Sequence, residues 1–295
     1  MQHETIQEKS KKNTEAFAKF TVKYSVFTTL FQDKKYLIQL YHALHPEDTE
    51  TREDEFIDIT IKNVLTNGIY NDLGFRVRDK IMILVEQQSS WTMNIIVRAL
   101  MYLTQTYHDY FEEQDADLYG SKKVHVPEPE LYVIYTGERV SKPETISFSK
   151  EFFGGKECAI EVKVKVIYDG KENDIISQYV TFTKVYNEQV KLYGRSKEAV
   201  TETIRICKDR DILREFLQSR EKEVISIMMT LFDEEKIMRT HIASERKEAS
   251  KETAQKAAEK MLKVGKMSTE EIAGYFSELS VEEVREIEKR LFQTT

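Results

Sequence analysis

The spacing of hydrophobic and polar positions changes twice in the first 60 residues. Over residues 34–44, apolar side chains recur at helical spacing, as at Tyr36, Leu40 and Leu44. A polar stretch rich in acidic residues follows, and residues 55–61 then alternate apolar and polar side chains. Such alternation is typical of a half-buried strand. We therefore expect a helix over residues 34–44, a loop, and a short strand.

The next pattern predicts a β-hairpin followed by a long helix. Two strand-like runs, GIYNDLGFRV and KIMILVEQQ, are joined at Arg78-Asp79. A connection of two residues predicts a hairpin. The second run contains the continuously apolar MILV, which favours a strand buried on both faces. Thr92 is placed to cap a helix over residues 93–111, whose apolar positions again follow helical spacing.

Two further strands and a helical second half complete the predicted fold. LYVIYTG and CAIEVKVKVIY are strand-like, whereas the pattern from Asn173 onward is helical. Near the end, Ser268 to Glu271 and Ser280 to Glu283 form two capping boxes, each of which predicts the start of a short helix. We expect an α/β fold with a mixed sheet flanked by helices, followed by an all-helical C-terminal region.

Four segments are expected along the chain. They are an N-terminal arm (1–32), an α/β domain (33–172), a helical extension (173–232) and a charged helical tail with a terminal helix pair (233–295). The arm is basic, because residues 9–35 hold seven lysines against two acidic residues. The tail could support assembly into a homo-oligomer.

Composition limits the classes of function. The formal net charge of −7 argues against a protein that coats nucleic acid, because such binding depends on phosphate neutralisation, but it leaves room for local contact with DNA. The two cysteines, Cys158 and Cys207, lack zinc-site spacing. The N-terminus does not resemble a signal peptide, and no apolar run approaches the ~20 residues of a membrane helix. We expect a cytoplasmic protein without a membrane partner.

Three polar residues at the hairpin are the candidates for chemistry. Asp72 and Glu86 lie 14 residues apart around the predicted turn, so we expect them opposite one another. Glu86 and Gln88 are two residues apart on one strand and share a face. Two carboxylates near one another suit Mg²⁺, which can activate water and stabilise charge on a phosphate. On spacing alone, two solvated acids at strand ends are the simpler interpretation.

A resemblance to a known family changes that balance. The order of an Asp, a hairpin, a Glu-x-Gln triplet and a long helix resembles the PD-(D/E)XK phosphodiesterases. More narrowly, YNDLGF, VEQQSS and LYGSKKVHVPEPELYVIYTGE are similar to segments of the bacterial recombination-promoting nuclease and transposase family, in that family's order over residues 30–290. The pair of motifs Asn71-Asp72-x-Gly-Phe and Glu86-x-Gln88-Ser89 is more specific than either alone.

The resemblance implies an α-β-β-β-α-β core that hydrolyses DNA with Mg²⁺ or Mn²⁺. Asp72 and Glu86 would be the metal ligands, and Gln88 would complete the catalytic set. Gln88 stands where the wider superfamily has lysine. This departure puts the rate and the mechanism in doubt, because lysine offers a positive charge whereas glutamine offers only a dipole.

Basic and aromatic residues nearby are the candidate DNA contacts. Arg98 and Tyr102 are one helical turn apart and share a face, so they either contact a phosphate or form a pair at the rim of the core. The remaining candidates are on the hairpin (Arg76, Arg78 and Lys80) and in a later loop (Lys122 and Lys123, for which a solvated loop is the alternative). The basic arm, together with Arg76, Arg78 and Lys80, is expected to supply most of the DNA contact.

Three functions remain open at this stage. The first is a Mg²⁺-dependent DNA endonuclease linked to recombination or mobile elements. The second is a catalytically weak DNA-binding or regulatory remnant of the same fold. The third is an interaction protein that oligomerises through its helical tail. The presence of both Asp72 and Glu86 favours the first over the second.

Overall fold

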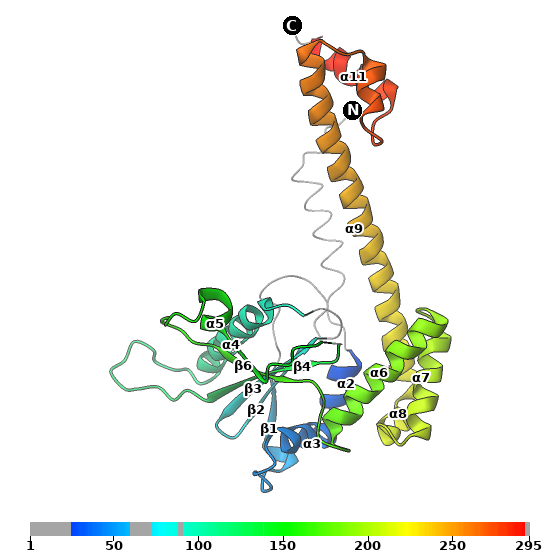
Figure 1. Cartoon of the computed structure of the whole chain (residues 1–295). Coiled ribbons are helices and arrows are strands. Elements are labelled where there is room, and N and C mark those ends of the chain that lie inside the picture. Colours follow the sequence, from blue (N-terminus) through cyan, green and yellow to red (C-terminus); the bar gives the residue numbers. More distant parts are fainter. Residues whose placement is uncertain (1–24, 60–71, 88–90, 138, 293–295) are drawn as a thin grey trace. The chain divides into compact units, whose positions relative to one another are not determined.

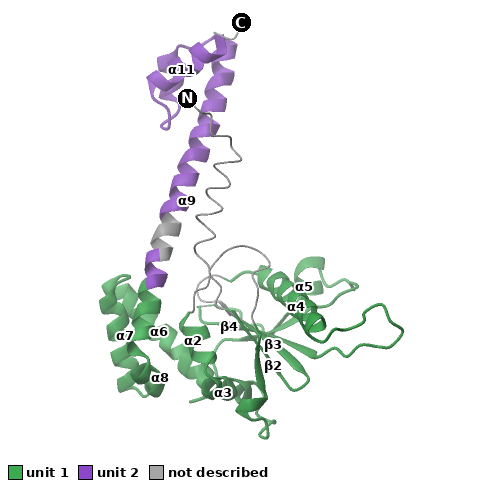
Figure 2. Cartoon of the chain, turned by 180° about the vertical axis from the view of Figure 1, so that it is seen from behind, with its two compact units in different colours: residues 1–229 green, residues 230–295 purple. Residues whose placement is uncertain are grey.

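The computed structural model of the 295-residue chain describes residues 25–59, 72–87, 91–137 and 139–292, with the side chains of residues 85–87 and 234–239 excepted. The chain divides into two compact units, Met1–Met229 and Thr230–Thr295 (Figure 2). The first unit contains the sheet and the second is helical. The predicted α/β fold with a helical C-terminal region is confirmed.

A six-stranded mixed sheet forms the centre of the first unit, with the strand order β1-β2-β3-β4-β6-β5 (Figure 1). The pairs β1/β2, β2/β3 and β5/β6 are antiparallel, whereas β3/β4 and β4/β6 are parallel. The strands are β1 (Phe56–Ile59), β2 (Asp72–Val77), β3 (Lys80–Gln87), β4 (Glu128–Tyr135), β5 (Thr145–Ser147) and β6 (Lys163–Ile167). A 3₁₀ turn, η1 (Glu53–Glu55), precedes β1.

The predicted hairpin is confirmed, with Arg78 and Asp79 as its two turn residues. Val77 pairs with Lys80, and the antiparallel register continues without interruption to Asp72 and Val85. Arg78 has a φ of 49°, in the left-handed region that two-residue hairpin turns require. Glycine or asparagine usually occupies such a position, which is why Arg-Asp is a weak turn signal in the sequence.

Helices cover both faces of the sheet. On one face, α4 (Asn94–Glu113) packs Ile95, Ile96 and Ala99 against the apolar side chains of β3, β4 and β6. On the other lie α2 (Val26–Phe31), α3 (Lys34–Leu44) and α6 (Ile175–Tyr193). The order α3-β1-β2-β3-α4-β4 is the α-β-β-β-α-β order expected from the sequence.

Helix α2 shows that the end of the expected N-terminal arm is part of the core. All six of its residues are buried, and the Ser25 hydroxyl caps it by accepting a hydrogen bond from the Thr28 amide at 3.1 Å. Phe27 and Phe31 both contact Tyr179 of α6, with ring centroids 5.3 and 6.2 Å apart. The chain therefore joins the core from Ser25 onward, whereas residues 1–24 of the expected arm lie outside the described residues.

Two short elements after β4 have no counterpart in the sequence prediction. They are β5, with three residues, and α5 (Phe148–Phe153), with six. Neither is long enough to display a hydrophobic period of its own. Strand β5 forms because it pairs with β6 at the edge of the sheet, and this pairing is a long-range contact.

The helices of the C-terminal half follow the predicted pattern. They are α6, α7 (Lys197–Asp209), α8 (Arg214–Ser219), α9 (Glu221–Val264), α10 (Thr269–Gly274) and α11 (Val281–Phe292). Both capping boxes are present, since Glu271 and Glu283 accept from the amides of Ser268 and Ser280 and the serine hydroxyls accept in return. In the second unit, α10 and α11 pack on α9 around Ala258, Ile272 and Val284.

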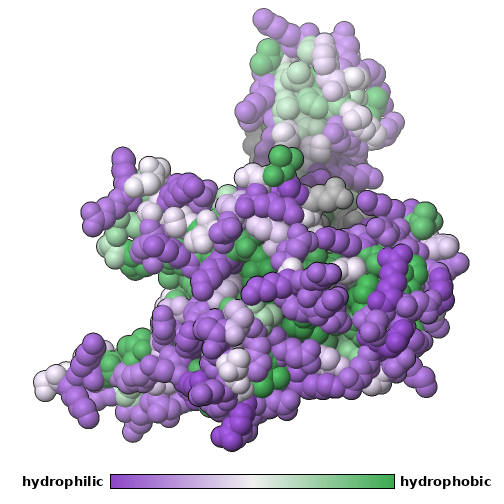
Figure 3. All heavy atoms as spheres, turned by 60° about the horizontal axis from the view of Figure 1, so that its bottom comes forward, coloured by the Kyte–Doolittle hydropathy of each residue, from purple (hydrophilic) through white to green (hydrophobic). Residues whose placement is uncertain are grey.

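Polar side chains cover most of the face seen in Figure 3, with apolar side chains in scattered patches between them. Among the residues that the structure describes, no helix combines the length and the apolar character needed to cross a membrane.

Candidate active site

One edge of the sheet collects the residues predicted for catalysis. Strands β3, β4 and β6 are parallel, so their carboxyl ends lie at the same edge. Strand β2 is antiparallel to β3, which places Asp72, its first residue, at that edge as well. The carboxyl edge of parallel strands is a common position for binding sites in α/β folds.

Asp72 is buried against helix α4. Its side chain is 1% exposed, and its Oδ2 accepts a hydrogen bond from a terminal nitrogen of Arg98 at 2.8 Å. The same nitrogen lies 3.4 Å from the hydroxyl of Tyr102, which is 1% exposed. The sequence left open whether Arg98 and Tyr102 contact a phosphate or each other; the structure brings them together around Asp72.

Burial and the Asp72 carboxylate together determine the protonation states of Arg98 and Tyr102. Burial raises the pKa of the Tyr102 hydroxyl, and the nearby Asp72 carboxylate raises it further. Burial by itself would lower the pKa of the Arg98 guanidinium, but the attraction of Asp72 and the hydrogen bond with Tyr102 reverse the direction, so that its pKa is raised. Arg98 therefore stays charged and Tyr102 stays neutral at physiological pH.

The register of the hairpin differs by one residue from the sequence prediction. Asp72 was expected opposite Glu86, but it stands opposite Val85. The reason is the turn: with Arg78 and Asp79 both in the connection, directly paired residues are always an odd number of positions apart. Residues that stand directly opposite share a face and the next residue along belongs to the other, so a regular ladder does not place Asp72 and Glu86 on one face.

The backbone of Glu86 continues the parallel ladder, where it pairs with Ile134 of β4. Its side chain, and the whole of Gln88, lie outside the described residues. The predicted convergence of Asp72, Glu86 and Gln88 therefore stays a prediction.

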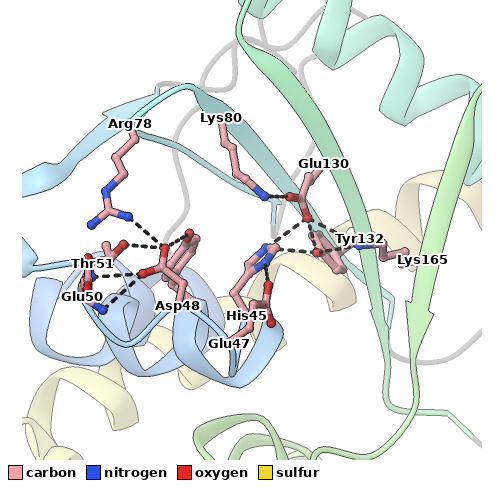
Figure 4. A network of polar contacts seen from close by, with 11 residues as sticks. His45, Glu47, Asp48, Glu50, Thr51, Arg78, Lys80, Glu130, Tyr132 and Lys165 are labelled. Atoms are coloured by element: carbon pink, nitrogen blue, oxygen red, sulfur yellow. Dashed lines mark hydrogen bonds and ion pairs between the residues drawn. The ribbon is translucent and has the colours of Figure 1, made fainter.

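The basic residues of the hairpin contact acidic residues or an aromatic ring. The guanidinium of Arg78 donates to Glu55 at 2.6 Å. It also donates to Asp48 at 3.1 Å (Figure 4). The guanidinium of Arg76 lies 5.3 Å from the ring of Tyr110 and 4.0 Å from the Glu113 carboxylate.

Lys80 belongs to a network that sequence reasoning did not find. Its ammonium pairs with Glu130, whose side chain is 10% exposed (Figure 4). Glu130 also accepts from the hydroxyl of Tyr132 and lies 3.1 Å from Nε2 of the buried His45 and 3.5 Å from Nζ of Lys165. Burial opposes ionisation of Glu130, but Lys80 and Tyr132 outweigh it and lower the pKa of Glu130 to about 2. The pieces come from α3, β3, β4 and β6, so no local pattern could reveal them.

Lys122 and Lys123 are exposed in the loop between α4 and β4. Within the part of the chain that the structure describes, neither forms an ion pair. Their position fits both the solvated loop and the DNA contact considered above.

A second acidic group lies on α4. His108, Asp109 and Glu112 have ligand atoms within 4.8 Å of one another. His108 and Asp109 are adjacent and Glu112 lies one turn further along the helix, which explains this proximity without an ion. The group lies about 15 Å along the helix from Arg98, at ~1.5 Å per residue, and is separate from the Asp72 edge.

The donor set at the Asp72 edge fits a divalent ion in type but is incomplete among the described residues. Carboxylate oxygens are the ligands that Mg²⁺ and Mn²⁺ accept. Asp72 supplies one buried carboxylate, and Glu86, the last residue but one of β3 at the same edge, carries the other candidate.

Comparison with known proteins found no match. The chain matches no family model, no curated protein and no solved structure.

Proposed function

We propose that the first unit is the core of a DNA endonuclease that depends on Mg²⁺ or Mn²⁺ and acts in recombination or on mobile elements. One observation carries the proposal. A carboxylate, Asp72, is buried at the sheet edge that also carries Glu86, near the end of β3, within the element order α3-β1-β2-β3-α4-β4 that the resemblance implies. The cleavage chemistry itself rests on the sequence motifs.

The residues of the site have distinct roles in this proposal. Asp72 and Glu86 would hold the ion, which when bound would activate water and stabilise charge on the scissile phosphate. Arg98 is a positioning residue, because its hydrogen bond fixes the Asp72 carboxylate. Gln88 would orient water or a phosphate oxygen through its amide.

The observed register adds a structural requirement. For both carboxylates to bind one ion, the pairing of β2 with β3 must become irregular near Asp72 or near Glu86. A β-bulge does this, since one extra residue turns the following side chain to the other face. The antiparallel ladder is regular from Val77/Lys80 to Asp72/Val85, and β3 pairs regularly with β4 as far as Gln87, so binding of one ion by both carboxylates would require a change of pairing at the open end of the hairpin.

A second candidate function is favoured by one contact. In the described structure the Asp72 carboxylate is already paired with Arg98 at 2.8 Å, which stabilises the buried charge without a metal ion. A DNA-binding or regulatory protein that retains the fold but not the catalysis would have this arrangement too.

Nicking of supercoiled plasmid by the purified protein, with and without Mg²⁺, separates the two. The informative variant is Asp72→Asn, which keeps an oxygen for Arg98 to donate to but removes the charge that binds the ion. Asp58→Asn, at an exposed position of β1, is the matched control. Circular dichroism checks that each variant is folded.

The proposal predicts Mg²⁺-dependent nicking that Asp72→Asn and Glu86→Ala abolish and Asp58→Asn retains. Gln88→Ala should lose about 100-fold or less, because it removes one orienting hydrogen bond and not the ion. Absence of Mg²⁺-dependent nicking by the wild type, or equal nicking by all variants, would favour the second candidate.

A further inference from the structure

A small cavity opens at the same sheet edge, beyond β4 and β6. It has a volume of about 250 Å³ and is lined by Thr136, Gly137, Arg139, Lys142, Tyr168, Asp169 and Lys184. Thr136 directly follows the end of β4, Tyr168 and Asp169 follow β6, and Lys184 comes from α6. Because Gln87 of β3 pairs with Tyr135 of β4, the cavity begins one residue beyond the register position where β3 ends.

The charges in the cavity are unbalanced. Arg139, Lys142 and Lys184 line it together with a single acid, Asp169. Asp169 accepts from the ammonium of Lys184 at 2.7 Å and from that of Lys142 at 3.2 Å, which holds the two lysines near one point. The hydrogen bonds from Lys184 and Lys142 keep the pKa of Asp169 below its ordinary value. One carboxylate cannot neutralise three cations, so the cavity attracts anions.

The guanidinium of Arg139 is held in place by an aromatic wall. It lies 3.9 Å from the ring centroid of Trp91, and its Nε donates to the Ser141 carbonyl. Trp91 in turn packs edge-on against Tyr135, with centroids 5.3 Å apart. An arginine stacked in this way loses little conformational freedom when it binds a ligand, and its planar fork suits phosphate oxygens.

Thr136 supplies a second, independent observation. The residue is 5% exposed, and its hydroxyl is buried without a hydrogen-bond partner among the residues that the structure describes. A buried hydroxyl without a partner costs free energy, so such groups usually serve a ligand, an ion or a water. A hydroxyl that lines a cavity with three cations can donate to an anionic oxygen.

We infer that this cavity is a phosphate-binding subsite in which Thr136, Arg139, Lys142 and Lys184 bind a phosphate of a nucleic-acid strand. The choice of a nucleic-acid strand rests on the proposed function, since the cavity adjoins the edge that carries Asp72 and Glu86. The phosphate itself could belong to the backbone or to a strand end, because both present the same anionic oxygens.

Binding of a fluorescein-labelled single-stranded oligonucleotide to the full chain tests the inference, by fluorescence polarisation in EDTA so that no cleavage occurs. The variants are Thr136→Val, Arg139→Met and Lys184→Met, with Lys197→Met at the start of α7 as the control for charge. Each cavity substitution should weaken binding about tenfold, as expected for a hydrogen bond to a charged group. The slope of log Kd against the logarithm of the salt concentration should decrease by about 0.7 for each cation removed.

A second arm identifies the source of the phosphate. Preference for a 5′-phosphorylated over a 5′-hydroxyl oligonucleotide, with competition by inorganic phosphate, indicates a strand end, and equal affinity indicates the backbone. Either result supports the subsite if the cavity variants bind the oligonucleotide more weakly than the wild type does. Unchanged affinity and salt dependence in Arg139→Met and Lys184→Met, with both variants folded, would overturn it. Binding is measured without a divalent ion and is therefore independent of cleavage. Loss of the subsite inference with Mg²⁺-dependent nicking intact, and loss of nicking with the subsite intact, are then distinct outcomes.

Discussion

Two groups of basic side chains lie near opposite ends of the strands of one sheet and have different surroundings. Arg78 and Lys80, on the β2–β3 hairpin, contact acidic residues: Arg78 has Asp48 and Glu55, and Lys80 has the buried Glu130. At the carboxyl end of the strands, Lys142 and Lys184 share Asp169, the one acid among the described residues that line the cavity with them and with Arg139. The first group is balanced by acidic partners, whereas the second carries an excess of positive charge.

The contrast teaches that a basic residue near a predicted site is not by itself a binding residue. In the sequence, Arg78 and Lys80 are close to Asp72 and Glu86, whereas Lys184 is about a hundred residues away. In the fold, their partners decide what each can do. A cation whose charge is already neutralised by its own carboxylate partner contributes less to phosphate binding than a cation that shares one carboxylate with other cations.

The largest expected effect tests whether the hairpin group is structural. Glu130→Gln should lower the free energy of unfolding by roughly 3 kcal/mol, because it removes the buried charge that Lys80, Lys165 and His45 surround. Urea denaturation followed by circular dichroism measures this. Glu128→Gln, exposed on the same strand, is the control and should change stability by less than ~0.5 kcal/mol.

The same substitution has a pH signature. The pKa of Glu130 is about 2 in the fold against an ordinary value of 4.5, so its contribution is complete above about pH 4.5 and is lost as the pH falls towards 2. The stability difference between wild type and Glu130→Gln should therefore shrink over that window. A difference that stays constant from pH 6 to pH 3 would show that the charge of Glu130 does not contribute.

A smaller effect is expected from the one acid of the cavity. Asp169→Asn removes its negative charge but keeps an oxygen for Lys142 and Lys184, so affinity for the oligonucleotide should rise by up to about fivefold at low salt. This corresponds to ~1 kcal/mol, the interaction of two unit charges ~4 Å apart in water. Polarisation titrations at two salt concentrations measure it. Weaker binding by Asp169→Asn would mean that Asp169 is needed to position the lysines.

The smallest effect concerns Arg78. Its ion pairs with Asp48 and Glu55 are open to solvent, so Arg78→Gln should lower stability much less than Glu130→Gln does. Its effect on oligonucleotide affinity should be about twofold at most, well below that of Arg139→Met. A loss of affinity as large as that of Arg139→Met would place the DNA contact on the hairpin, as the sequence first suggested, and would reverse the comparison.

The elements that could be predicted from the sequence are those with a clear hydrophobic period or a local cap. The apolar spacing over residues 34–44 became α3, the alternation around Phe56 became β1, and the capping boxes at Ser268 and Ser280 start α10 and α11. These features depend on residues within one or two turns of each other, which is the range over which a pattern is informative. The mixed sheet followed from the order of these elements.

Only the tertiary structure decided the rest, because each remaining feature depends on contacts between distant residues. The register placed Asp72 opposite Val85 and not Glu86, and α4 brought Arg98 to the Asp72 carboxylate across 26 residues. Helix α2 joined the core through Tyr179, and the cavity brought together Thr136 and Asp169, which follow two strands, and Lys184 of a helix. A sequence pattern reports the period of one segment, whereas a site is made where several segments meet.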